Sequence, residues 1–349
     1  MRSPPGVGDA VAHRGDDIGR AGGTPVVAIT ATIAGRQRTV HLKLEGANPS
    51  GSVKDRTAVA LIEDLERRGL LRSGSIIVES TSGNLGVALA TIARRRGYRF
   101  HAVVDPKLTP ENHARLVALG AQVERVTRPD GSGGYLLSRL GRVRELCASS
   151  DAFVWPDQYT NPANPRAHEH GTGPELLAQL GGALDAVLVP VSTGGTLAGI
   201  ARFLRRASPS TWIVAVDVAG SVALGGRAAP RLLTGIGASR PSAFLSAGMY
   251  DQGIQVRDAA AFAFCRGLAA ATGVRVGGSS GATLAACARL LAAEPDLGRV
   301  VCVCPDRGER YASTIYDHDW LASHGIEPAR LTIDPVETIA EEPRALAAA

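Results

Sequence analysis

Three lysines, Lys43, Lys54 and Lys107, provide all the side-chain primary amines of this 349-residue chain. An amine can form a Schiff base with an aldehyde, so such chemistry has three candidates. Lys54 lies in the turn NPSGSVKDR, where a helical pattern begins, and the helix dipole there lowers the pKa of an amine. Lys43 alternates within a strand and is expected to face solvent, and Lys107 lies in a turn. On this turn alone, an exposed lysine without a chemical role is the commoner case.

The loop STSGNLG (80–86) joins a strand-like segment to a helical one. Thr81, Ser82 and Asn84 supply hydroxyl, amide and backbone N–H donors. Because the N-terminus of a helix attracts anions, the loop suits the carboxylate of a substrate. The same residue types are equally typical of an ordinary helix N-cap.

Two later loops repeat the order of strand, glycine-rich turn and helix. In VSTGGTLAG (191–199), glycines let the backbone approach a phosphate, and Thr193 and Thr196 add hydroxyls. The loop lacks the GK[ST] ending of a P-loop and the GxGxxG spacing of a dinucleotide site, so a small phosphate such as that of pyridoxal phosphate (PLP) fits better. In RVGGSSGAT (275–283), Ser279 and Ser280 could contact a ring nitrogen or cap the helix.

Strand-like and helix-like segments alternate along the chain. Strands are predicted at 39–45, 75–80, 99–105, 121–126, 186–191, 212–218 and 299–304, and helices at 57–70, 84–96, 111–120, 197–206 and 281–293. This alternation predicts an α/β fold with largely parallel sheets and helices on both faces. The irregular segment 156–175 is expected to be a domain junction or a functional loop.

Composition argues against several classes of partner. The net charge of +5 does not indicate nucleic-acid binding, because the arginines are scattered and aromatic residues are only 4% of the chain. No apolar run approaches the roughly 20 residues that span a bilayer, and the first 17 residues lack the apolar stretch of a secretory signal. We therefore expect a cytoplasmic protein that binds neither nucleic acid nor membrane. Its five cysteines are expected to be reduced thiols, with Cys302 and Cys304 in a buried strand.

In their order along the chain, the loops resemble those of the cysteine synthase and cystathionine β-synthase family, which are fold-type II PLP enzymes. The resemblance covers residues 22–320 and rests on NPSGSVKDR, TSGNLG, NPANPRAHEHGTGPE, VSTGGTLAG, TGIGAS, GGSSGAT and PDRGERY. It implies an α/β fold like that of the tryptophan synthase β chain, with two three-layer αβα domains and mostly parallel sheets.

The resemblance also implies where the domains lie. A large PLP-binding domain would comprise residues 21–49 and 156–335, and a small mobile substrate domain residues 50–155. Residues 1–20 would form a peripheral N-terminal segment and residues 336–349 a C-terminal tail. A homodimer is expected from the resemblance as well.

By this resemblance Lys54 is the catalytic residue and binds PLP as a Schiff base. Asn84 would contact the ring hydroxyl of the cofactor and Ser279 the ring nitrogen. The residues implied in phosphate binding lie in one loop: Ser192, Thr193, Gly194, Gly195 and Thr196. The residues implied in binding the substrate carboxylate are Thr81, Ser82, Gly83 and Gln158. No metal is implied, and we expect His168 to make structural hydrogen bonds rather than to bind one.

A serine at the ring nitrogen has a chemical consequence. A neutral hydroxyl does not keep the pyridine nitrogen protonated as a carboxylate would, so the ring is a weaker electron sink. Loss of a leaving group from Cβ is then favoured over transamination. The resemblance thus implies a PLP-dependent transferase that performs β-replacement on an O-activated L-serine, with Lys54 removing the α-proton.

Departures from cysteine synthases bear on the substrate. Leu85 stands where Thr is usual, and Ser192 where glycine is usual. The segment GGYLLSR (133–139), with QYTN and TGIGASR, is more similar to the 2,3-diaminopropionate-pathway synthases of siderophore and antibiotic biosynthesis. These use O-phospho-L-serine and L-glutamate to make N-(1-amino-1-carboxyethyl)glutamate. By that resemblance Arg139, Tyr159 and Ser192 would recognise the substrate, because an arginine suits a phosphate or a second carboxylate.

Alternatives remain open at this point. Arg139 could be an exposed helix arginine, Asp306 could lie at the cofactor or cap a loop, and Glu309 and Arg310 could form a surface ion pair. The reaction could be cysteine synthesis from O-acetylserine or O-phosphoserine and sulfide. A cofactor-free regulatory or partner-binding protein on the same fold is the alternative from another class.

Overall fold

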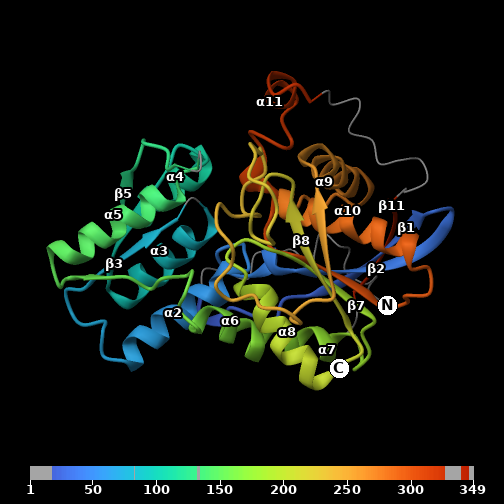
Figure 1. Cartoon of the computed structure of the whole chain (residues 1–349), viewed down its shortest axis with the longest axis horizontal. Coiled ribbons are helices and arrows are strands. Elements are labelled where there is room, and N and C mark those ends of the chain that lie inside the picture. The colour runs from blue at the N-terminus through green and yellow to red at the C-terminus, as the bar shows by residue number, and fades with distance from the viewer. Residues whose placement is uncertain (1–17, 82, 132–133, 327–338, 346–349) are drawn as a thin grey trace, which may run out of the picture.

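The computed structural model describes residues 18–81, 83–131, 134–326 and 339–345, and its strands form two sheets (Figure 1). The large sheet has the strand order β11-β1-β2-β10-β7-β8-β9, and the small sheet has the order β5-β4-β3-β6. The small sheet with its helices lies on the left of Figure 1 and the large sheet on the right.

The large sheet is built mostly from parallel pairs. Its strands are β1 (Val26–Ile33), β2 (Arg36–Leu44), β7 (Ala186–Pro190), β8 (Trp212–Val218), β9 (Gln252–Val256), β10 (Val300–Cys304) and β11 (Ile339–Ala345). Strand β1 pairs antiparallel with β2 and β11, whereas β2, β10, β7, β8 and β9 run parallel. The turn between β1 and β2 has positive φ at both Ala34 and Gly35, as the twist of a tight hairpin requires.

Helices cover both faces of the large sheet. They are α6 (Ala163–Ala167), η3 (His168–Thr172), α7 (Gly173–Gln179), α8 (Gly195–Ala207), α9 (Asp258–Thr272) and α10 (Gly278–Ala293). The chain also contains the short helices η1 (Ile18–Arg20), η2 (Glu45–Ala47), η4 (Gly308–Tyr311) and α11 (His318–Ser323). Along β7, Leu188 packs in a core with α9 and α10, and Val187 packs in a second core with α7 and α8. This alternation makes three layers.

The small sheet is parallel throughout. Its strands are β3 (Ile76–Ser80), β4 (Arg99–Val104), β5 (Gln122–Arg125) and β6 (Phe153–Val154), and its helices are α2 (Lys54–Arg67), α3 (Asn84–Arg96), α4 (Pro110–Ala118) and α5 (Leu136–Ser149). Ile77 packs with α2 and α3, and Val78 with α5 on the other face. The predicted α/β fold of two three-layer units is confirmed, and the exact domain boundaries stay a prediction.

Several elements escaped sequence reasoning. Strand β1, helices α5 and α9 and strand β9 were not predicted. The segment treated as a C-terminal tail includes β11, which is an edge strand of the large sheet. Its Pro343 has no backbone N–H, and an edge strand tolerates this because one side needs no partner. Within the part of the chain that the structure describes, no helix has the length and apolar character to cross a membrane.

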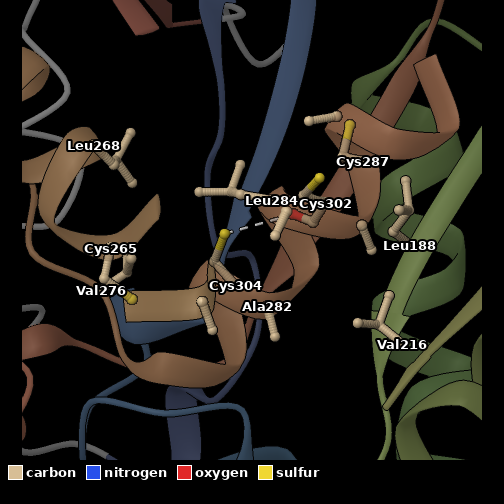
Figure 2. Close-up of a cluster of buried hydrophobic side chains, with 14 of the residues drawn as sticks. Leu188, Val216, Cys265, Leu268, Val276, Ala282, Leu284, Cys287, Cys302 and Cys304 are labelled. Atoms are coloured by element: carbon tan, nitrogen blue, oxygen red, sulfur yellow. Dashed lines mark hydrogen bonds between the residues drawn. The ribbon is translucent and has the colours of Figure 1, made fainter. Parts of the chain in front are cut away.

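The buried cysteines behave as small apolar residues (Figure 2). Cys302 and Cys304 in β10 lie in one core with Cys265 of α9 and Cys287 of α10. All are free thiols, and burial raises the pKa of Cys304 to about 12. A thiol with so high a pKa is a poor nucleophile and metal ligand, so this cluster is structural.

A buried ionic cluster fixes the helix that begins at Lys54. The Arg56 guanidinium donates to both carboxylate oxygens of Glu45 (2.8 and 2.9 Å) and to both of Glu175 (2.7 Å each). Lys43 donates to the same Glu175 (2.7 Å) and to Gln179 (2.8 Å). Lys43 is 0% exposed, so the prediction that it faces solvent is wrong. Its strand is covered on both faces, so alternation did not reveal an outward side.

We predict that Arg56→Met lowers the free energy of unfolding by about 3–5 kcal/mol, because the fully buried Glu45 loses its counter-charge. The control is Arg67→Met on the same helix, where a 65% exposed arginine pairs with Asp64. It should cost less than about 1 kcal/mol. Chemical unfolding of both variants measures the difference. Equal midpoints for the two would contradict a structural role for the cluster.

Candidate active site

A cavity of about 180 Å³ is lined by loop and helix residues from both the small-sheet and the large-sheet parts of the chain. The residues predicted for the site that line it are Lys54, Thr81, Gly83, Asn84, Arg139, Gln158, Tyr159, Ser192, Thr193 and Ser279. Gly194, Gly195 and Thr196 continue from Thr193 into the start of α8 without lining the cavity. Ser82 lies outside the described residues, so its predicted role stays a prediction.

The amine of Lys54 is suited to nucleophilic chemistry. Lys54 is the first residue of α2, and the structure gives its amine no hydrogen bond to a described residue. Burial lowers the pKa of Lys54, and the nearby charge of Asp306 opposes that shift only in part. The predicted lowering of the pKa is therefore present, although burial is its main cause rather than the helix dipole.

Helix N-termini at the cavity carry few capping side chains. Neither α8, after Gly194, nor α10, after Gly277, has a side-chain hydrogen bond from its N-cap residue. The N-terminus of α3 differs, because the Thr81 hydroxyl accepts from the Gly86 N–H at 2.9 Å. Capping thus explains part of the 80–86 loop but not the other two, whose first N–H groups can bind anions.

The start of α8 has the shape of a phosphate site. Gly194 has a φ of +89°, and a Cβ there would come within 2.1 Å of the Ser242 hydroxyl. That hydroxyl donates to the Thr193 carbonyl at 2.7 Å and holds the turn in place. The α8 N-terminus, with its partial positive charge, directly follows Ser192 and Thr193, which line the cavity.

His168 holds this loop through hydrogen bonds to neighbouring hydroxyls. Its Nε2 lies 3.3 Å from the hydroxyls of Thr57 and Thr196, and its Nδ1 lies 2.9 Å from that of Thr172. Burial lowers the pKa of His168 to about 3, so the ring is neutral. The predicted structural hydrogen bonds of His168 are confirmed.

Asn84 is held by two charged groups. Its amide nitrogen donates to Asp306 at 2.6 Å, and its amide oxygen accepts from Arg310. Tyr311 also donates to Asp306, at 2.6 Å. Arg310 is 5% exposed, so the predicted surface ion pair with Glu309 is wrong. The guanidinium turns inward because Asn84 and the Ser50 carbonyl accept its N–H groups.

Ser279 also lines the cavity. It is the second residue of α10 and is 2% exposed, and its hydroxyl has no hydrogen bond to a described residue. A hydroxyl in such a place can donate to or accept from a ring nitrogen. Its contact with the cofactor stays a prediction.

A buried carboxyl group joins the two loops predicted to bind the substrate carboxylate. Glu79, at the end of β3, accepts from the N–H groups of Ser80 (2.8 Å), Gln158 (3.1 Å) and the Trp155 ring (3.0 Å). The Gln158 side chain donates back to the Ser80 carbonyl at 2.9 Å. Burial raises the pKa of Glu79 to about 8. A charged residue in an otherwise apolar strand was the signal that sequence reasoning missed.

Arg139 is buried rather than exposed. It comes from α5, is 6% exposed, and its Nε lies 3.0 Å from Asp105. Its buried Nη1 has no hydrogen-bond partner in the described structure. Tyr159 lies under the guanidinium of Arg240 at 4.9 Å, and the Ser192 hydroxyl donates to the Gly237 carbonyl at 3.3 Å.

These features together fit PLP. An open helix N-terminus suits the phosphate, the unbonded Ser279 hydroxyl suits the ring nitrogen, and the unbonded Lys54 amine suits the aldehyde. Asn84 lies in the same cavity, where its amide is held in place.

Comparison with known proteins agrees with this fit. The chain is 48% identical over 301 residues to an N-(2-amino-2-carboxyethyl)-L-glutamate synthase of Ralstonia nicotianae, covering 86% of this chain and 89% of that protein. A protein of the same name from Cupriavidus metallidurans is 42% identical, covering 91% and 94%. The structure of an O-acetylserine-dependent cystathionine β-synthase from Helicobacter pylori superposes with a TM-score of 0.79 at 32% identity, covering 86% and 98%.

The family model described as pyridoxal-phosphate-dependent enzyme matches residues 19–306, which include every described residue predicted to bind the cofactor. The chain therefore belongs to the family of pyridoxal-phosphate-dependent enzymes.

Proposed function

We propose that this enzyme replaces the phosphate of O-phospho-L-serine with the amine of L-glutamate. The product is N-(2-amino-2-carboxyethyl)-L-glutamate, a precursor of 2,3-diaminopropionate. The expected name N-(1-amino-1-carboxyethyl)glutamate does not describe this connectivity. Addition at Cβ places the amino and carboxyl groups on the second carbon of the ethyl group, as the names of the relatives state.

The observation that carries the proposal is the match, over about nine-tenths of their lengths, to two synthases of that name. The buried Arg139 supports it, because its free Nη1 offers a charged donor inside the cavity. A guanidinium binds a phosphate ester strongly and a neutral acetyl ester weakly. This favours O-phosphoserine over O-acetylserine as the donor.

When bound, PLP would withdraw electrons from the substrate amino acid, acidify its α-proton and permit loss of the β-leaving group. Lys54 accepts the α-proton on its amine, whose lowered pKa lets the neutral form be populated. Arg139 donates to the departing phosphate and offsets its negative charge.

The substrate carboxylate would lie between the 80–86 loop and Gln158. Glu79 fixes their separation because it accepts from backbone N–H groups on both sides of that site. Glu79 touches no substrate in this arrangement, so it acts as a positioning residue. A carboxylate bound there would hold the Cα proton toward Lys54.

Other features carry over from the resemblance as proposals. We propose that residues 50–155 form a mobile small domain that closes over the substrate and excludes water. The protein is proposed to be a cytoplasmic homodimer whose partners are amino-acid substrates rather than nucleic acid or membrane.

The proposed reaction predicts which pair of substrates the enzyme couples. Purified enzyme with O-phosphoserine and glutamate should release phosphate, and mass spectrometry should detect the coupled amino acid. O-acetylserine with sulfide is the competing pair. If that pair has the higher kcat/KM, the enzyme is a cysteine synthase and the proposed function is wrong.

The assignment of Lys54 predicts a spectroscopic change when its amine is removed. Lys54→Ala should lose the visible absorbance of the lysine–cofactor bond, whereas Lys107→Ala, at the exposed edge of the same cavity, should keep it. Borohydride reduction of the native enzyme followed by peptide mass spectrometry locates the bond independently. Label on a peptide without Lys54 would overturn the assignment.

The positioning role of Glu79 predicts a change in the KM for the amino-acid donor. Glu79→Ala leaves three N–H groups without acceptor, so the KM for O-phosphoserine should rise by about tenfold or more, with a smaller change in kcat. Glu79→Gln keeps one acceptor oxygen and should fall between it and the wild type. Glu124→Ala, in the same sheet but paired with His101 and Arg142, is the control and should leave KM within about twofold. Equal KM values for all of them would rule out a positioning role.

A further inference from the structure

A second arginine lines the cavity on the side of the large sheet. Arg231 lies in the connection between β8 and β9, close in sequence to the cavity-lining segment 233–239. It is half-buried, and its Nη1 donates to the Gly220 carbonyl at 3.0 Å. No carboxylate of the described chain forms an ion pair with it.

Nearby acids do not neutralise this guanidinium directly. Asp258 accepts from the backbone N–H groups of Leu232 (2.7 Å) and Leu233 (3.3 Å), and Asp217 accepts from Val218 (2.8 Å). Burial lowers the pKa of Arg231, and the charges of Asp217 and Asp258 only oppose this. A partly desolvated cation without a bound anion is a favourable place for a carboxylate.

The other charged groups of the cavity lining are already engaged or exposed. Arg139 pairs with Asp105 through Nε and is assigned to the leaving phosphate through its free Nη1, and Asp306 accepts from Asn84. Lys54 is taken by the cofactor, and Lys107 is exposed to solvent. Arg231 is thus the half-buried cation of the described lining that has no direct ion pair, although the charges of Asp217 and Asp258 act on it from a distance.

We propose that Arg231 binds a carboxylate of the incoming amino-acid nucleophile and selects glutamate over nucleophiles without that charge. This inference rests on the proposed function. Glutamate carries two carboxylates, whereas sulfide carries none, so only the glutamate reaction needs a cationic site besides the one for the leaving group. Arg139 on α5 and Arg231 on the β8–β9 connection divide these two tasks.

Steady-state kinetics with glutamate varied at saturating O-phosphoserine test the proposal. Arg231→Met should raise the KM for glutamate by roughly 10- to 100-fold, because a charge-assisted hydrogen bond is lost. The KM for O-phosphoserine should change less than threefold. Glutarate, which has the carboxylates but no amine, should inhibit the wild type competitively against glutamate and inhibit the variant at least tenfold more weakly.

Arg227→Met is the matched control, since Arg227 is an exposed arginine of the same connection outside the cavity lining. It should keep the wild-type KM for both substrates. If the methionine variant does not fold, Arg231→Gln replaces it in the test, because glutamine can still donate to Gly220. The visible absorbance of bound PLP reports whether each variant is folded. A wild-type KM for glutamate in folded Arg231 variants overturns the inference alone. Failure of the wild type to couple glutamate overturns the proposed function, and the inference with it.

Discussion

The contact of Arg56 with one buried and one half-buried carboxylate is the constraint on which the site depends. Arg56 lies two residues after Lys54, and its guanidinium bonds to Glu45 beyond β2 and to Glu175 in α7. The first turn of α2 is thereby fixed to the large sheet, while the rest of the helix packs under the small one. Removing one ion from such a cluster leaves an unpaired buried charge, so the loss of any single member strongly destabilises the fold.

The lining of the cavity beside that fixed turn concentrates positive charge. Helix starts at Asn84, Gly195 and Gly278 supply partial positive charge, and Arg139 and Arg231 supply full charges. The cofactor phosphate and acidic substrates are the natural counter-charges for such a lining. The same field explains why the few acids present, such as Asp306 and Asp105, are each bound by neighbouring donors.

Sequence reasoning succeeded where the signal was local. The buried strands, the helices that follow glycine-rich turns and the position of Lys54 all depend on neighbouring residues, and the structure has them as predicted. It failed for Lys43 and Arg310, because each is buried by partners more than a hundred residues away in the chain. Glu79 was overlooked although it is a charged residue in a buried strand, and Arg231 because only the fold places it at the cavity. Strand β11 was missed because its pairing with β1 joins the two ends of the described chain.

The pairing of β2 with β10 also determines the order in which the chain can fold during synthesis. Val40 pairs with Val300, so the centre of the large sheet cannot close until the last quarter of the protein has left the ribosome. The small sheet uses only strands between Ile76 and Val154, and its core can form much earlier. The β1–β2 hairpin must therefore wait, with the backbone N–H and C=O groups of the β2 edge unpaired, while more than 250 residues are translated. Contacts so distant in sequence slow folding and expose edges to aggregation, which makes chaperone supply a practical variable in producing this enzyme.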